Sequence, residues 1–353
     1  MEEVVIVGGG PAGLTAALSL LEEGISPLVL ERSTEFGHKA CGELMAEKLY
    51  GFDVGELVKG SVEKIHENLV VRFHDRELHF SGIIAPGWQT EFRFLFINRK
   101  RWESQLAKKV ERKGGEIRRE EVRSLGVGEG CLLLNEKLRT KFVIGADGAL
   151  SLVRCFLGGK VKHFGFAVGK RISGKMVEEV EPTLIVNPLL SPSGYAWIFP
   201  GKKEANVGIG EWYGRGIGAW EAWKRFSRKL GVEEEGTRGA FIPLSLSTRT
   251  WGRRTILVGD AGGFTDPLTG GGLNAACFTG WLGGKTCARA LKGGKERPEE
   301  YEKNWRRGLY PKHLRSYFLA HLFYRFLFRW KRLTPFFAKP FLKGERSLAS
   351  PQG

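Results

Sequence analysis

The sequence of 353 residues has few cysteines and no motif among them. Its five cysteines form no CxxC pair and no other spacing typical of metal ligands, which excludes a disulfide framework and a zinc site and favours a reducing compartment. No stretch has the roughly 18 consecutive apolar residues that a membrane-spanning helix needs. The chain begins with MEE and enters an apolar run at once, so we expect no signal peptide and a cytoplasmic location.

Acidic residues are absent between Lys303 and Lys343, a segment with eleven lysines and arginines and twelve aromatic residues. These eleven charges make up most of the net charge of +16. Such a segment is typical of a nucleic-acid-binding surface, of a helix on an anionic membrane, or of a terminal helix packed on the protein with its cations outward. We expect the membrane and no nucleic acid, so that the protein associates peripherally with the inner face of the cell membrane.

Residues 317–328 of this segment predict the helix that contacts the membrane. The run is twelve residues long and is interrupted only by His321 and Arg325, so it is too short to span a bilayer and suits an interfacial helix. Arg325, Arg329 and Arg332 have the spacing of one helix face, which predicts a cationic stripe along it.

The N-terminal segment VVIVGGGPAGLTAALSLLEEG is typical of a dinucleotide-binding strand, turn and helix. Gly8, Gly10 and Gly13 fit the G-x-G-x-x-G pattern: the first makes the turn, the second lets the backbone approach a pyrophosphate, and the third lets helix and strand pack closely. The start of the helix offers unpaired N–H groups to the phosphates. A second strand, SPLVLER, ends at Glu31, whose carboxylate can accept hydrogen bonds from ribose hydroxyls.

Two later segments favour a flavin over a nicotinamide cofactor. FVIGADGALSLVR predicts a strand that ends near Asp147, and TILVGDAGGFTDPLTGGGLNAA predicts a strand that ends near Asp260, followed by a second glycine turn and a helix. A strand-terminal Asp beside glycines can reach a ribityl or ribose hydroxyl. Glycines 270–272, with Gly271 at their centre, let the backbone lie against a flat ring.

GYAWIFPGKK, residues 194–203, places three aromatic residues at alternate positions and ends in turn chemistry. This period predicts a strand with Tyr195, Trp197 and Phe199 on one face, and ANVGIG after the turn predicts the partner strand of a hairpin. The aromatic face belongs either to the protein core, as most such stripes do, or to the wall of a cavity for an apolar substrate.

Together these segments resemble the glutathione-reductase-type FAD fold, without the CxxxxC pair of a disulfide reductase. PSGYAWIFP, EFGHKACGELM and VGDAGGFTDPLTGGGL are similar to segments of the geranylgeranyl reductase family, whose archaeal members saturate the isoprenoid chains of membrane ether lipids. NRKRWESQLAKKV also resembles the helix of that superfamily that brings an arginine to the cofactor. The resemblance covers residues 1 to about 290 and implies FAD at the matching positions Ala12, Glu31, Cys41, Gly42, Leu44, Arg99, Val122, Asp260, Gly272 and Leu273. We expect these further residues to hold FAD: Gly8, Gly10, Gly13, Arg32, Asp147 and Gly271.

The resemblance also implies the reaction, which is saturation of carbon–carbon double bonds in geranylgeranyl chains of lipid precursors. Such an alkene needs a hydride and a proton, and positive charge that develops on it favours aromatic walls. Tyr195, Trp197 and Phe199 are the candidate substrate wall, and Tyr195 or Cys41 is the candidate acid. The neighbouring cations of His38 and Lys39 are expected to lower the pKa of Cys41, which is otherwise a small buried hydrophobe.

Three other functions fit the same residues. These are a reductase of the prenyl tail of a quinone, an aromatic-ring monooxygenase, and a flavoprotein that transfers electrons at the membrane. The last would be expected to carry a metal-cluster motif, which the cysteines do not permit. The electron donor stays open between NAD(P)H and a ferredoxin-like protein, because a nicotinamide needs no motif of its own on this fold.

The predicted fold class is α/β, with a Rossmann-type FAD domain and an inserted antiparallel substrate sheet. The FAD domain is discontinuous and takes residues 1–60, 95–160 and 250–295. The substrate domain takes residues 61–94 and 161–249, and residues 296–353 form a helical, basic-aromatic C-terminal region.

Overall fold

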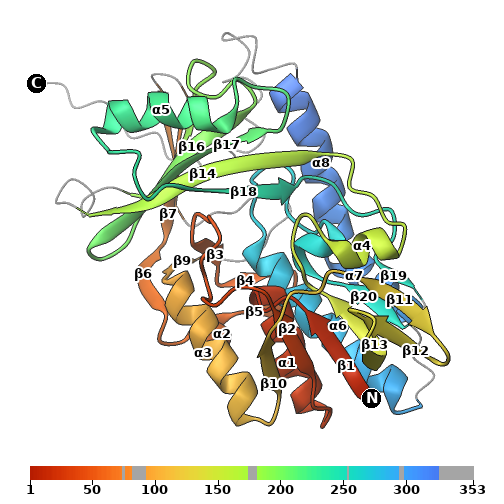
Figure 1. The fold of residues 1–353 in the computed structure, drawn as a ribbon. Helices are drawn as coiled ribbons and strands as arrows, with labels where there is room; N and C mark the ends of the chain where they lie inside the picture. Colours follow the sequence, from red (N-terminus) through yellow and green to blue (C-terminus); the bar gives the residue numbers. More distant parts are fainter. Residues whose placement is uncertain (74–75, 82–92, 174–180, 253, 294–297, 326–353) are drawn as a thin grey trace, which may run out of the picture.

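The computed structural model of the protein describes residues 1–73, 76–81, 93–173, 181–252, 254–293 and 298–325 (Figure 1). An α/β body that contains the N-terminus lies below a second sheet, which is covered on its outer side by helix α5. Helix α8, the last described element, runs along one side from the body to the second sheet.

The sheet of the α/β body is built on five parallel strands in the order β10-β2-β1-β13-β20. β1 (Glu2–Val7) leads through a glycine turn into α1 (Pro11–Glu22) and then into β2 (Leu28–Glu31). The other strands of this sheet are β10 (Glu116–Arg119), β11 (Leu125–Gly128), β12 (Cys131–Leu134), β13 (Leu138–Gly145), β19 (Trp251–Gly252) and β20 (Thr255–Leu257).

Both faces of this parallel sheet are covered, which explains why its strands are continuous apolar runs in the sequence. Val4 and Ile6 of β1 pack in the main core with helices α1, α3 (Arg99–Arg112) and α6 (Leu273–Leu291). Val5 and Val7 point to the opposite face and pack with β12 and with α4 (Leu152–Phe156). The predicted strand, glycine turn, helix and second strand are confirmed.

The second sheet has seven strands in the order β18-β14-β17-β16-β15-β7-β8. Its strands are β7 (Asn68–Phe73), β8 (Arg76–Ser81), β14 (Phe164–Ser173), β15 (Thr183–Val186), β16 (Gly194–Pro200), β17 (Glu204–Trp212) and β18 (Arg238–Pro243). All pairs are antiparallel except β7 with β15, which come from distant parts of the chain and run parallel. The hairpin predicted from the aromatic strand is confirmed as β16 and β17.

The alternation along β16 separates two environments. Ala196 and Ile198 pack outward against α5 (Ala219–Leu230), in a cluster with Trp223 and Phe226. Trp197 and Phe199 point the other way, toward the α/β body, and cluster with Phe96. The predicted aromatic face therefore lies on the side of the sheet that faces the glycine turns.

Smaller elements join the two sheets. β3 (Leu44–Ala46), β9 (Phe94–Ile97) and β6 (Val62–His66) form a three-stranded sheet next to α3. The remaining elements are β4 (Lys48–Leu49), β5 (Phe52–Asp53), α2 (Gly55–Val58) and a short 3₁₀ helix, Gly259–Gly262. The predicted α/β class with a FAD-type domain, a second sheet and C-terminal helices is confirmed. The exact domain boundaries stay a prediction.

The C-terminal helices pack on the α/β body. α7 (Pro298–Gly308) buries Tyr301 and Trp305, and α8 (Tyr310–Arg325) buries His313 and Ala320. The helix predicted from Tyr317 thus begins seven residues earlier, at Tyr310, and part of its surface is core, because Ala320 packs with Trp212 and Leu244. Two of the three arginines of the predicted cationic stripe, Arg329 and Arg332, lie outside the described residues. Among the described helices, not one has the length and hydropathy needed to cross a bilayer.

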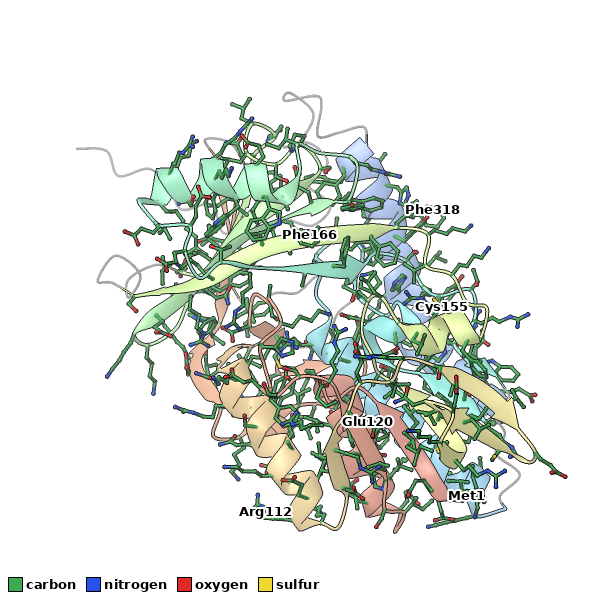
Figure 2. All side chains as sticks on the ribbon, viewed as in Figure 1. Met1, Arg112, Glu120, Cys155, Phe166 and Phe318 are labelled. Atoms are coloured by element: carbon green, nitrogen blue, oxygen red, sulfur yellow. The ribbon has the colours of Figure 1, made fainter. Side chains whose placement is uncertain are left out.

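Two substitutions on α8 test which of its faces is core. Ala320→Glu is expected to reduce the free energy of unfolding by at least about 2 kcal/mol, because a carboxylate at this fully buried position has no partner. Phe318→Glu is the matched control, since Phe318 is 64% exposed and points away from the body (Figure 2). Denaturant unfolding of both variants measures the difference, and equal stabilities would show that α8 does not pack as described.

Candidate functional site

A cavity of about 1840 Å³ lies between the two large sheets. The glycine turns of the α/β body line one side of it, the aromatic face of β16 lines another, and α8 borders it through Lys312, Ser316 and Leu319. Almost every residue predicted to hold the cofactor or the substrate lines this one cavity: Gly8, Gly10, Ala12, Glu31, Arg32, Cys41, Gly42, Leu44, Arg99, Val122, Asp147, Tyr195, Trp197, Phe199, Asp260, Gly271, Gly272 and Leu273.

The first glycine turn has the shape that a pyrophosphate requires. Gly8 has φ +102°, a conformation that residues with a side chain rarely adopt. A Cβ atom on Gly13 would lie 1.9 Å from the Gly8 carbonyl oxygen, so helix α1 can approach β1 only because this residue is glycine. A Cβ on Gly10, in contrast, would meet nothing within 4 Å. The backbone at Gly10 therefore leaves room for phosphate oxygens at the start of α1.

Two of the predicted carboxylates are held by backbone N–H groups. Glu31 accepts hydrogen bonds from the amides of Gly9, at 2.6 Å, and Ser33, at 2.7 Å, and so braces the glycine turn. Asp147 accepts from the Ser151 hydroxyl and from the Leu152 amide, and thus caps helix α4. Burial raises the pKa of Asp147 despite these hydrogen bonds. The contact of either carboxylate with a ribose or ribityl hydroxyl stays a prediction.

Asp260 forms an ion pair across the cavity. Its carboxylate accepts hydrogen bonds from Lys39 Nζ at 2.7 Å and from the Thr265 hydroxyl at 2.9 Å. Burial opposes the charge of Asp260, but Lys39 outweighs burial through its charge and its hydrogen bond, so the pKa of the carboxyl is lowered. Asp260 therefore presents an ionised acceptor at the end of β20, beside the second glycine turn.

Cys41 has a different electrostatic environment from the one expected. Burial raises the pKa of its thiol, and the main opposing charge comes from Arg99. His38 bonds to the Glu35 carbonyl oxygen and Lys39 to Asp260, so neither supplies the cation that the sequence predicted for this cysteine. Arg99 lies at the start of α3, is 7% exposed, and pairs with Glu103 at 2.5 Å.

The aromatic face of β16 is both buried and part of the cavity wall. Trp197 is 6% exposed and Phe199 9% exposed, and their rings stack with centroids 6.4 Å apart. The Trp197 ring fits only because β17 has a glycine opposite it, where a Cβ on Gly208 would lie 2.1 Å from the indole. Tyr195 donates its hydroxyl hydrogen to the Thr269 carbonyl oxygen, next to glycines 270–272. The two interpretations of this strand, core and cavity wall, are thus not exclusive.

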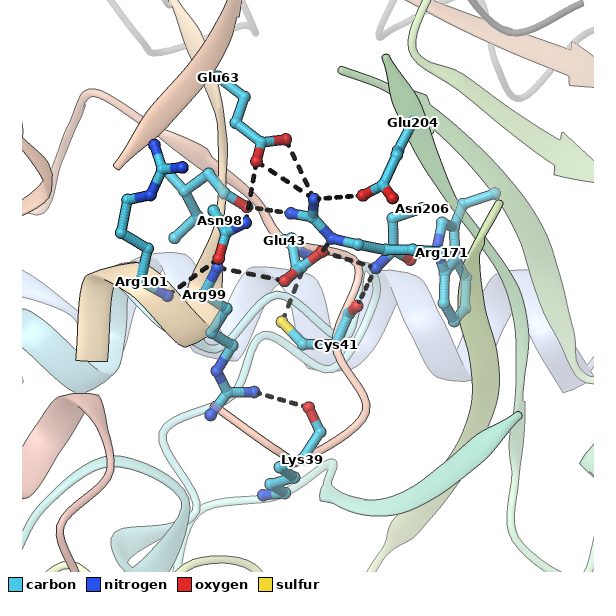
Figure 3. Close-up of polar contacts among 12 residues, drawn as sticks. Lys39, Cys41, Glu43, Glu63, Asn98, Arg99, Arg101, Arg171, Glu204 and Asn206 are labelled. Atoms are coloured by element: carbon cyan, nitrogen blue, oxygen red, sulfur yellow. Dashed lines mark hydrogen bonds and ion pairs between the residues drawn. The ribbon is translucent and has the colours of Figure 1, made fainter. Parts of the chain in front are cut away.

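A polar cluster behind Cys41 was missed by sequence reasoning (Figure 3). Arg171 of β14 donates to Glu43 at 2.6 Å and also contacts Glu63 and Glu204. Asn206 of β17 donates to Glu43 and accepts a 2.8 Å hydrogen bond from the Trp197 indole. The signal in the sequence was a pair of charged residues, Lys170 and Arg171, within an otherwise mostly apolar strand.

The residues present fit a dinucleotide with a flat ring. The open backbone at Gly10 suits the pyrophosphate, and a Cβ on Gly271 would meet only the Thr269 side chain, at 3.2 Å. Two carboxylates can accept hydrogen bonds from hydroxyl groups: that of Glu31 at the end of β2 and that of Asp260 just after β20. The described ranges contain no cluster of three or more His, Cys, Asp or Glu residues that could hold a metal ion.

Comparison with known proteins agrees with this site. Residues 1–44 match the FAD binding domain family. Digeranylgeranylglycerophospholipid reductase 2 of Methanopyrus kandleri is 30% identical over 325 residues, which are 82% of this chain and 78% of that protein. The reductase of the same name from Methanocaldococcus jannaschii is 26% identical over 358 residues, which are 92% of this chain and 85% of that protein.

Solved structures share the fold over nearly the whole chain. A geranylgeranyl bacteriochlorophyll reductase-like protein from Thermoplasma acidophilum is 21% identical, covers 92% of this chain and 87% of its own, and has a TM-score of 0.75. A probable FAD-dependent monooxygenase from Pseudomonas aeruginosa is 18% identical, covers 92% of this chain and 97% of its own, and has a TM-score of 0.70. At these identities the likeness to solved structures concerns the fold alone. The similarity in sequence, which reaches 30% over most of both chains, also identifies the family: the chain belongs to the digeranylgeranylglycerophospholipid reductase family of FAD-dependent oxidoreductases.

Proposed function

We propose that this protein saturates carbon–carbon double bonds in the geranylgeranyl chains of a membrane-lipid precursor. The observation that carries the proposal is the composition of this cavity, which has glycine turns for FAD on one side and Tyr195, Trp197 and Phe199 on another. Its volume of about 1840 Å³ exceeds the roughly 300–1,000 Å³ that is usual for one small-molecule ligand. The cavity therefore has the volume for an apolar chain in addition to FAD.

The aromatic wall serves the chemistry as well as the binding of the chain. Bound FAD, once reduced, supplies the hydride that this reaction requires. The ring faces of the wall stabilise positive charge that develops on the alkene when a proton arrives first. The wall also excludes water, because Trp197 and Phe199 are almost fully buried and pack with Phe96.

Cys41 suits the role of proton donor better than Tyr195. Burial raises the pKa of the Cys41 thiol, so the thiol keeps its proton at neutral pH, as a general acid must. The Tyr195 hydroxyl already donates its hydrogen to the Thr269 carbonyl oxygen, and burial raises its pKa as well. In this scheme one alkene carbon takes the Cys41 proton, the other takes the hydride, and solvent returns a proton to the thiolate.

The other candidate functions have less support. A quinone with a prenyl tail would use the same wall and the same chemistry, so only the substrate differs. The monooxygenase among the solved structures shares the fold at 18% identity, which carries no information on the reaction. We propose NAD(P)H or a ferredoxin-like protein as the electron donor, and neither is favoured over the other.

We propose further that helix α8 brings the cavity to a lipid surface. Leu314, Phe318 and Leu322 are spaced by four residues, so they form one row on the helix, and each is more than a third exposed. Lys312, Ser316 and Leu319 of the same helix line the cavity. An apolar row in a chain with net charge +16 fits an anionic bilayer, and a prenyl chain that enters beside α8 would not have to cross water.

Product analysis tests the reaction. We expect reduced enzyme, incubated with a geranylgeranylated glycerophospholipid, to yield products heavier by two hydrogens for each double bond, as measured by mass spectrometry. A geranylgeranylated phospholipid that is recovered unchanged, while a prenylated quinone is saturated, would move the assignment to the quinone. A hydroxylated aromatic product formed with rapid O₂ consumption would reject the reductase.

Substitution of the two candidate acids separates their roles. Cys41→Ser is expected to lower turnover at least about tenfold, with FAD content unchanged, and Tyr195→Phe to lower it less. Because burial raises the pKa of Cys41, wild-type turnover should persist through neutral pH and fall as the pH rises through that pKa, where the thiol loses its proton. Cys155→Ser is the control, since Cys155 is an exposed cysteine on α4. The reverse order of Cys41→Ser and Tyr195→Phe would assign the acid to Tyr195.

Liposome binding tests the surface of α8. The protein is expected to sediment with vesicles of an anionic phospholipid, less so as salt is raised, because screening weakens the attraction. Phe318→Glu should weaken this binding. Val127→Glu is the matched control: Val127 is 77% exposed, and it lies on β11, at the edge of the sheet of the α/β body. If the two variants bind vesicles equally, the row on α8 is not the contact.

A further inference from the structure

Glu43 lies where the cofactor side of the cavity meets the substrate wall. It follows Cys41 and Gly42 in the loop before β3 and is 9% exposed. The same loop packs on the aromatic wall, since a Cβ on Gly42 would lie 2.9 Å from the Phe199 ring. A buried carboxylate at this junction requires an explanation, because an ionised group leaves water only when it gains partners.

Each partner of the Glu43 carboxylate comes from a different part of the site (Figure 3). Oε1 accepts from the backbone amide of Arg99, at the start of α3, at 3.2 Å. Oε2 accepts from Arg171 of β14 at 2.6 Å and from Asn206 of β17 at 3.0 Å. One side chain thus joins the helix that carries Arg99 to two strands of the second sheet.

Asn206 extends this connection to the reacting end of the cavity. Its side-chain NH₂ also donates to the Cys41 carbonyl oxygen at 2.7 Å, and its oxygen accepts from Trp197 Nε1 at 2.8 Å. The Glu43 amide in turn donates to Cys41 Sγ at 3.4 Å. The positions of the Cys41 loop and of the Trp197 indole therefore depend on the same pair of side chains.

The backbone of Glu43 adds a second observation. Its φ of +60° lies in the left-handed region, which costs a residue with a side chain on the order of 1 kcal/mol or more. Glycine would adopt this conformation without strain. A glutamate here is consistent with a need for the carboxylate itself, and not only for the turn.

We propose that Glu43 is a positioning residue that sets the distance and orientation of the substrate wall relative to Cys41 and the cofactor side of the cavity. It does so through Asn206, which orients the Trp197 indole, and through Arg171, which Glu63 and the Ile97 carbonyl oxygen hold from the other side. The role in turnover rests on the proposed function, whereas the role in holding the Cys41 loop does not.

The experiment compares Glu43→Gln with Glu204→Gln. Both remove one carboxylate from Arg171, but Glu204 is more exposed, and within the described residues its carboxylate forms no hydrogen bond to Cys41 or Asn206. Glu43→Gln is expected to lower kcat for a prenyl substrate at least about tenfold, since a small displacement of the reacting atoms has that effect. FAD content should not change, and Glu204→Gln should keep turnover within about twofold of wild type.

A readout without substrate tests the loop alone. The readout is the rate at which iodoacetamide alkylates Cys41 in a protein whose exposed Cys155 is replaced by Ser. At high pH, where the thiol is fully ionised, this rate reaches a limit that reports the access to Sγ and not its pKa. This rate should rise at least about threefold in Glu43→Gln and stay at the wild-type value in Glu204→Gln. If wild type saturates no prenyl chain, the proposed function fails, and the alkylation rates still decide the role of Glu43 in the loop.

Asn206→Ser covers the case in which Glu43→Gln does not fold. It removes the link to Trp197 and Cys41 while it leaves the ion pair of Glu43 with Arg171 in place. We expect a lower kcat and faster Cys41 alkylation, with a melting temperature near that of wild type. Wild-type turnover and alkylation in Asn206→Ser, or in a folded Glu43→Gln, would overturn the proposal.

Discussion

The ion pair between Glu43 and Arg171 connects the Cys41 loop, which leads into β3, to strand β14 of the seven-stranded sheet. The walls of the cavity depend on this connection, because Asn206, which contacts Glu43, is also hydrogen-bonded to Cys41 and Trp197. The pair and its neighbours Glu63 and Asn206 join this loop to strands β6, β14 and β17. A partly buried ion pair of this kind contributes little net stability, whereas the loss of one partner leaves the other charge buried and is strongly destabilising.

The cavity that results is polar at one end and aromatic at the other. Backbone amides, Glu31 and the ion pair of Asp260 with Lys39 lie on the side of the glycine turns, where they suit phosphates and hydroxyl groups. Trp197 and Phe199 lie on the side of the second sheet, where they suit a hydrocarbon chain. Cys41 lies between the two sides: it packs against the main core of the α/β body, and burial raises the pKa of its thiol.

Helix α8 combines three roles on one short element. Ala320 fixes it to the core through Trp212 and Leu244, Leu319 faces the cavity, and Phe318 faces outward. Tyr324 also donates a hydrogen bond to the Leu268 carbonyl oxygen, in the loop that leads to glycines 270–272. A movement of α8 would therefore displace residues that line the cavity.

The sequence by itself determined the parts of this protein that depend on neighbours in the chain. The strand, glycine turn and helix around Gly8, Gly10 and Gly13 follow from residue type and spacing, and so does the hairpin that carries Tyr195, Trp197 and Phe199. Such elements are local, because a turn needs glycine and a strand face needs period two wherever the segment is placed.

Only the tertiary structure decided which side chains meet. Glu43 and Arg171 are 128 residues apart, and Lys39 and Asp260 are 221 apart, so no local pattern predicts either pair. The cation beside Cys41 was expected from the adjacent His38 and Lys39, yet it comes from Arg99, because both neighbours are bound elsewhere. Packing also decided that one face of α8 is core, at Ala320, whereas the contact of this helix with a membrane stays a prediction. Burial and ion pairing are properties of the space around a residue, and that space is set by contacts between segments distant in the sequence.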